Sequence, residues 1–74
     1  MPIVFAPLNE ELVITKVSLD DKTKKRLESL GILVNAKINI LSSIGGNVIV
    51  LIKSSRLAID KNIATKIFVR REAQ

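Results

Sequence analysis

The absence of cysteine is the feature that most constrains how this chain can fold. A domain of 74 residues buries only about 60% of the surface that its unfolded chain exposes, and domains of this size often depend on disulfides or a structural metal. The sequence has no cysteine and no histidine, so a disulfide framework and a Cys/His zinc site are both excluded. We therefore expect one domain, residues 1–74, held together by side-chain packing alone.

The same absences narrow the function. A cysteine nucleophile and a histidine general base are excluded, and the Gly45-Gly46 pair lacks the Lys-Ser/Thr that a phosphate-binding loop requires. We therefore predict that the protein is not an enzyme and binds no cofactor. The net charge of +5 favours acidic partners, nucleic acid or an anionic membrane surface, although a small domain also needs net charge for solubility.

Hydrophobic residues make up 47% of the chain, and nearly all of them are aliphatic. Such a small fold is not expected to bury every one, so some apolar surface is left for a protein partner. The only aromatic residues are Phe5 and Phe68. Small basic domains that bind RNA usually stack bases on exposed aromatic rings, so we expect a protein partner, with nucleic acid as the alternative.

The aliphatic residues occur in short runs typical of β-strands. Val and Ile dominate Leu12–Val17 and favour a pleated sheet. Residues 36–40 alternate apolar and polar, as in a strand with one wet face. The next run, 47–53, is apolar on both faces and is expected to be either a core strand or a strand that faces a partner or self-associates. Residues 56–59 and 66–70 complete the five predicted strands. Residues 71–74 are expected to form a frayed tail.

Turn residues separate these runs. Asn9 to Glu11 precede the first strand, Val34-Asn35 precede the second, Ser43 to Asn47 form a hairpin connection, and Lys53 to Ser55 form the next turn. Asp60 is placed to cap a single helical turn over residues 60–65.

One segment has the signature of a longer helix. Asp20 is a good N-cap, and Gly31 is a good residue to end the helix in left-handed geometry. The apolar stripe between them consists only of Thr23, Leu27 and Leu30. We therefore predict a surface helix over about residues 20–30 that buries one thin edge. Five short strands with this helix after the first predict a mainly β fold, a small five-stranded SH3-like barrel.

Several segments, taken in order, resemble one family. Arg26–Ile32 is similar to a helix end of pattern R-L-x-x-L-G-[LI], and Asn35–Leu41 to a strand of pattern G-x-x-[IV]-x-[IV]-L. Gly45–Val50 is similar to the hairpin G-[DG]-x-[IV]-x-[IV], Ser55–Ile59 to [GS]-x-R-L-A-[IL], and Ala64–Val69 to the closing A-x-x-I-x-V. Together they cover about residues 7–70 and resemble the FeoA family, ferrous iron transport accessory proteins with an SH3-like domain.

The resemblance implies a small cytoplasmic accessory protein that acts with FeoB, the membrane ferrous iron transporter with a cytoplasmic GTPase domain. Any contact with the membrane would then be made through that partner. The same SH3-like domain occurs at the C-terminus of some metal-dependent repressors of the DtxR type, which makes a free-standing regulatory domain a further alternative. In this family the leucine pair at the helix end packs onto the barrel, and the helix-ending glycine is left-handed. The structural motif residues are then Leu27, Leu30, Gly31, Gly45, Gly46 and Leu57.

The chain departs from the family pattern at two turns. Asn9-Glu10 stand where the family usually has a glycine, and Val34-Asn35 stand where it usually has Pro-Gly. Because asparagine tolerates left-handed geometry, we expect the fold to be kept.

Partner-binding candidates come from the basic residues. The run Lys22 to Arg26 is the most basic stretch, and it is either an electrostatic docking face or a solvated helix face. Arg56 is either an interface anchor or a side chain that covers the barrel and pairs with a carboxylate. The candidate residues are Lys22, Lys25, Arg26 and Arg56.

The carboxylates do not suggest a metal site. Asp20-Asp21 and Asp60 are placed as helix caps, and Glu10-Glu11 belong to a turn. We therefore predict no metal ligands. No run approaches the roughly 20 apolar residues of a membrane helix, and the start of the chain lacks the basic region of a signal peptide, so we expect a cytoplasmic protein.

Overall fold

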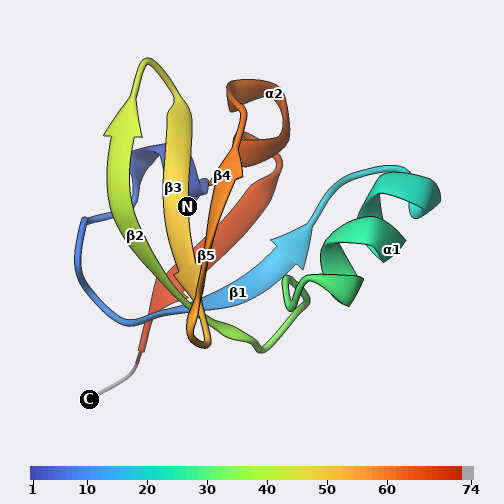
Figure 1. The fold of residues 1–74 in the computed structure, drawn as a ribbon, viewed down its shortest axis with the longest axis horizontal. Helices are drawn as coiled ribbons and strands as arrows, with labels where there is room; N and C mark the ends of the chain where they lie inside the picture. Colours follow the sequence, from blue (N-terminus) through green and yellow to red (C-terminus); the bar gives the residue numbers. More distant parts are fainter. Residues whose placement is uncertain (73–74) are drawn as a thin grey trace.

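The computed structural model describes residues 1–72, and within them the chain forms an antiparallel β-sheet with three helical segments (Figure 1). The elements in chain order are a 3-10 helix η1 (Ile3–Phe5), β1 (Leu12–Val17), α1 (Asp21–Ser29), β2 (Lys37–Ile44), β3 (Asn47–Ile52), β4 (Ser55–Ile59), α2 (Lys61–Ala64) and β5 (Ile67–Arg71). The prediction of five strands with a helix between the first two is confirmed. The expectation of a frayed tail over residues 71–74 is wrong at its start, because Arg71 is the last residue of β5 and the N–H of Glu72 donates to the carbonyl of Glu11. Residues 73–74 lie outside the described part.

The strands follow the order β4-β3-β2-β1-β5, and every neighbouring pair is antiparallel. The register shifts between Ile14 and Lys16 in β1 and between Ile40 and Ser42 in β2. Such bulges bend and twist a strand, and the sheet curls around one core as in an SH3-like barrel. β4 and β5 are its two edges, so hydrogen bonds between strands do not close the barrel within residues 1–72.

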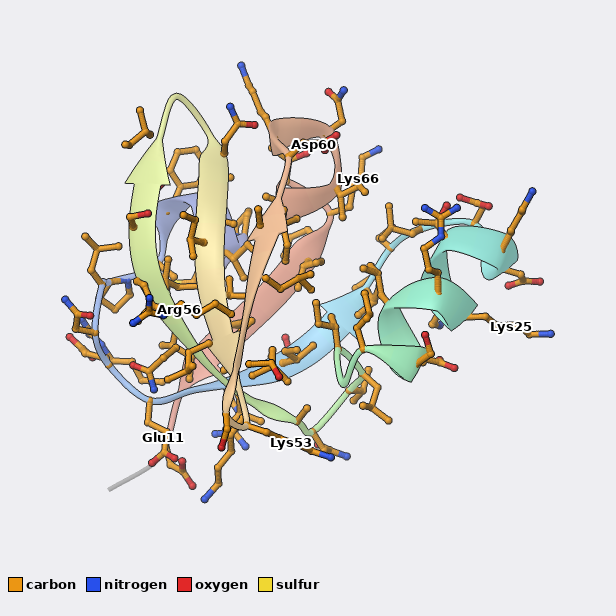
Figure 2. All side chains as sticks on the ribbon, in the orientation of Figure 1. Glu11, Lys25, Lys53, Arg56, Asp60 and Lys66 are labelled. Atoms are coloured by element: carbon orange, nitrogen blue, oxygen red, sulfur yellow. The ribbon has the colours of Figure 1, made fainter. Side chains whose placement is uncertain are left out.

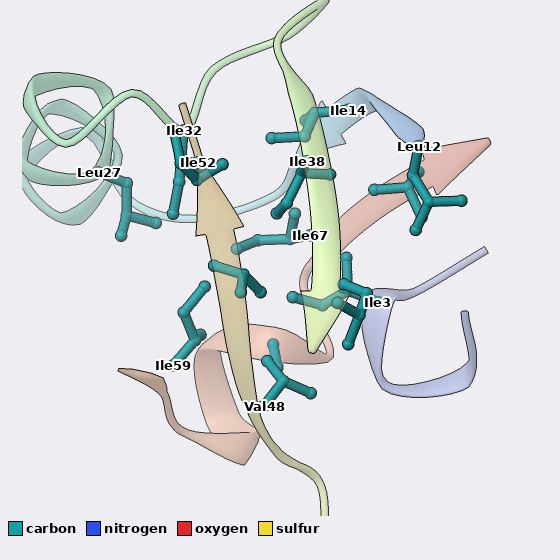
Figure 3. Close-up of a cluster of buried hydrophobic side chains, with 14 of the residues drawn as sticks. Ile3, Leu12, Ile14, Leu27, Ile32, Ile38, Val48, Ile52, Ile59 and Ile67 are labelled. Atoms are coloured by element: carbon teal, nitrogen blue, oxygen red, sulfur yellow. The ribbon is translucent and has the colours of Figure 1, made fainter. Parts of the chain in front are cut away.

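The core is made of aliphatic side chains from the concave side of this sheet, together with a few from the helical segments and the loop after α1 (Figure 3). Its fully buried large members include Leu12, Ile14, Ile38, Ile40 and Ile67. No polar or charged residue is buried in the described part of the chain. The fold is therefore held by apolar packing, as the lack of cysteine and histidine requires.

The N-terminal segment joins this core, which the sequence patterns did not indicate. Ile3 of η1 is completely buried. The backbone of Met1 exchanges hydrogen bonds with Val69 of β5, with N to O distances of 3.0 and 2.8 Å, and Pro2 forms an antiparallel bridge with Phe68. The resemblance drawn over residues 7–70 therefore left out a segment that completes the barrel.

Both ends of α1 are capped as expected. The Asp20 carboxylate accepts from the backbone N–H of Thr23 at 3.3 Å. At the other end Gly31 has a φ of +98°, its N–H donates to the carbonyl of Glu28, and the N–H of Ile32 donates to that of Leu27. This pair of bonds is the Schellman motif, and the buried side chains of Leu27 and Ile32 make the apolar contact that accompanies it.

The leucine pair of α1 is split, which differs from the expectation that both pack on the barrel. Leu27 is buried, whereas Leu30 caps the helix and is 47% exposed. Because Gly31 turns the chain sharply, it is Ile32, completely buried, that enters the core after the helix.

The turns follow the glycine and asparagine positions. Gly45 and Gly46 both have positive φ and connect Ile44 to Asn47 in a two-residue hairpin, so the turn is tighter than the expected Ser43 to Asn47 connection. Asn9 and Asn35 have φ of 60° and 76°. Asparagine therefore takes left-handed geometry at both turns, as expected.

Candidate functional site

The basic residues of α1 project into solvent from a helix that stands to one side of the sheet (Figure 2). Lys22, Lys25 and Arg26 are exposed, and Leu27 is the one buried residue of α1. The three ion pairs within residues 1–72 join Lys37 and Arg71 to glutamates, so the charges of α1 are not neutralised by the fold that the structure describes. A thin apolar edge thus anchors a helix whose cations are available to a partner.

A groove runs between α1 and β4, beside the start of α2. It has a volume of about 270 Å³. Its apolar lining includes Leu27 and Leu30 from α1, Leu57 from β4 and Ile63 from α2, and Arg26 stands at its α1 wall. Residues far apart in sequence therefore combine an aliphatic floor with a cationic side chain, an arrangement typical of protein-binding surfaces.

Arg56 lies apart from the cations of α1. It is exposed and is paired in register with Leu51, and its side chain extends across the outer face of the sheet, whereas Lys25 points away on α1 (Figure 2). The structure therefore brings Arg26 together with Leu27, Leu30 and Leu57, but it does not place Arg56 in the same cluster.

The outer face of the β2–β3–β4 hairpins carries a second hollow, of about 450 Å³. Ile44 and Ile49 line it and are 78% and 42% exposed, and Ala58 lies on its β4 side. In the run Val48–Ile52, Val48, Val50 and Ile52 are buried while Ile49 is exposed. This run is therefore a core strand on one face, and Ile49 on its other face is exposed, as the partner-facing alternative requires.

Most of the carboxylates have structural roles in the described chain. Asp20 and Asp60 cap α1 and α2, Glu10 pairs with Arg71 at 3.0 Å, and Glu11 lies 3.9 Å from Lys37. Residues 1–72 contain no group of three or more carboxylates placed to hold a metal ion. Hydrogen bonds from the Thr23 hydroxyl and backbone N–H hold the pKa of Asp20 below its ordinary value.

None of the helices formed by residues 1–72 has the length and apolar character needed to cross a membrane.

Comparison with known proteins shows which family this chain belongs to. The FeoA domain matches residues 1–71. The chain belongs to the FeoA domain family. A curated relative of this FeoA domain, “Putative Fe(2+) transport protein A” of Methanocaldococcus jannaschii, is 34% identical over 68 residues, which cover 92% of this chain and 83% of the relative. The family match includes the N-terminal segment that carries Ile3.

Solved structures share the fold. A crystal structure of the iron uptake regulatory protein FeoA superposes with a TM-score of 0.86 at 22% identity, covering 97% of each chain. The solution structure of FeoA from Chlorobium tepidum gives a TM-score of 0.86 at 23% identity, covering 99% of this FeoA domain and 71% of that chain. ScaR with bound Zn²⁺ gives 0.82 at 16% identity, covering 97% of this chain and 37% of that one. At these identities the likeness shows the fold alone.

Proposed function

We propose that this FeoA domain is an accessory protein of ferrous iron uptake and that it acts by binding the cytoplasmic part of a FeoB-type transporter. The observation that supports this role most directly is the family match over residues 1–71, together with a relative of almost equal length named for Fe(2+) transport. On this proposal the domain works in the cytoplasm as a binding module and carries out no catalysis.

The groove between α1 and β4 is the docking surface that the geometry favours. Leu30 is 47% exposed beside Arg26, and Lys22 and Lys25 extend from the same helix. Apolar surface supplies most of the affinity in such contacts, while a cationic rim accelerates the encounter with an acidic surface and makes it sensitive to salt.

Charge reversal on α1 tests the docking surface. We expect the double variant Lys25→Glu/Arg26→Glu to associate more slowly with the purified cytoplasmic domain of the FeoB-type transporter from the same organism. We also expect the salt dependence of its association rate to be lost, because the steering charges are gone. The measurement is surface-immobilised binding kinetics at two salt concentrations, with circular dichroism to show that both proteins are folded.

Lys53→Glu/Arg70→Glu is the matched control. It makes the same change in net charge at two exposed residues that lie outside α1 and the groove, so its association rate should fall much less. Equal rates for the α1 variant and the wild type at both salt concentrations would show that α1 is only a solvated face. No measurable binding of the wild type would contradict the proposed partner itself.

A further inference from the structure

The strand β4 has an open hydrogen-bonding edge. β4 is the last strand of the sheet on its side, and its pairing with β3 begins with Ile52 and Ser55 around a two-residue turn. The residues that flank such a turn form a hydrogen-bonded pair, and hydrogen-bonded and non-hydrogen-bonded pairs then alternate. The backbone N–H and C=O groups of Arg56 and Ala58 therefore point away from β3, toward the open side.

The groove lies along this same edge. Leu57, Ala58 and Ile59 of β4 form one wall, and Leu27 and Leu30 of α1 face them. A chain that paired with β4 would direct every second side chain toward the core-facing side of the sheet. Those side chains would enter the groove beside Leu57, whereas the intervening ones would lie on the outer face beside Arg56.

The charges around the edge indicate the composition of such a chain. Arg56 is exposed on the outer face, and the ion pairs formed within residues 1–72 do not include it. Arg26 stands at the groove wall. Opposite charges on neighbouring strands of a pair are favourable, so carboxylates are the side chains that complement the outer positions.

We propose that β4 receives an extended segment of the partner as an added antiparallel or parallel strand. This segment has aliphatic side chains at the positions that face the groove and acidic side chains at the alternate positions that face Arg56. Its backbone bonds to Arg56 and Ala58 supply affinity, and the groove and Arg56 select the sequence, as in other cases of strand addition. The proposal rests on the function proposed above, because it specifies how the same surface is occupied.

Amide hydrogen exchange of the wild-type protein tests the proposal without any mutation. In the free protein the amides of Arg56 and Ala58 should exchange rapidly, while that of Leu57, paired with β3, should be protected. On saturation with the transporter's cytoplasmic domain, we expect the amides of Arg56 and Ala58 to slow by about tenfold or more, because exchange then requires release of the added strand.

Proline substitution removes one edge donor. Ala58→Pro deletes an N–H that points away from β3, so the β3–β4 ladder is kept, since proline is tolerated on the open side of an edge strand. Ala58→Ser is the matched control, because it changes the same exposed side chain and keeps the N–H. We expect the proline variant to bind the cytoplasmic domain about tenfold more weakly, and the serine variant to bind like the wild type.

The outcomes separate the two proposals. If the transporter domain binds but Arg56 and Ala58 remain unprotected, strand addition is wrong while the accessory function stands. If the free protein already shows concentration-dependent protection of these amides, a second copy of this chain occupies the edge, and the proposal is likewise overturned. If Ala58→Pro does not fold, the exchange measurement on the wild type still decides. Absence of any binding removes the proposed function and, with it, this inference.

Discussion

Replacing Gly31 by alanine should destabilise this domain more than the same replacement at Gly45, where the added Cβ has open space. Gly31 has a φ of +98°, and an added Cβ would lie 2.7 Å from Cγ2 of Ile52, which is buried in β3. Left-handed geometry costs a residue with a side chain about 1–2 kcal/mol, and overpacking a core costs about 1–3 kcal/mol. The expected loss is about 2–5 kcal/mol.

That loss is large for a chain of this size. Domains have stabilities of about 0.05–0.15 kcal/mol per residue, so these 74 residues correspond to about 4–11 kcal/mol. The assay is urea denaturation followed by circular dichroism, because the chain has no tryptophan or tyrosine to report by fluorescence. The midpoint should fall with little change in slope if both states keep their compactness.

Gly45 provides the matched control. It has a φ of +60°, and its added Cβ would meet no heavy atom of the described chain within 4 Å apart from its immediate neighbours. Gly45→Ala should therefore show only the backbone cost of about 1–2 kcal/mol. In addition, Ile52→Leu removes the clashing Cγ2 while keeping the volume, so in the Gly31→Ala/Ile52→Leu double variant the two costs should be less than additive. Equal losses for Gly31→Ala and Gly45→Ala would refute the steric argument.

Three further changes test other parts of the structure. Lys53 has a φ of 56°, so Lys53→Gly should raise stability by about 0.5–1 kcal/mol, and a lower melting temperature would contradict this. Ile3 is fully buried, so Ile3→Ala should lower stability by about 2–5 kcal/mol in urea denaturation, whereas a surface-like effect would show that η1 does not complete the core. The pKa of Asp20 is lowered in the folded state, so its contribution is fully present above the unfolded value of about 3.9 and is lost as pH falls through the folded value. The advantage of the wild type over Asp20→Asn in melting temperature should therefore shrink as the pH falls below about 4, and a difference independent of pH would refute this.

Local patterns predicted most of the elements of this fold. The first strand, Leu12–Val17, was predicted with the observed bounds. The ends of α1, after Asp20 and before Gly31, could also be predicted, because each capping signal depends only on residues within one turn of the helix. The left-handed positions of Asn9 and Asn35 were likewise predictable from residue type alone.

The rest depends on contacts between distant residues. The burial of Ile3 arises from pairing of the N-terminus with β5, and a three-residue 3-10 helix between Pro2 and Pro7 is too short to give a periodic signal. The groove combines Arg26 and Leu30 with Leu57 and Ile63, which no spacing in the sequence relates. The sequence indicates the cations of α1 and Arg56 as candidates for partner binding, but it does not show that they lie on different parts of the surface.

The strand order has a consequence for the way in which the chain folds. The β2–β3 and β3–β4 hairpins each close around two residues, whereas β1 meets β5 through pairs such as Leu12 with Arg71, from opposite ends of the chain. Closing a long loop costs more entropy than closing a short one, and distant pairings slow folding. We therefore expect the three-stranded meander β2–β3–β4 to organise the transition state, so that mutations in it change the folding rate while mutations along the β1–β5 seam mainly change the unfolding rate.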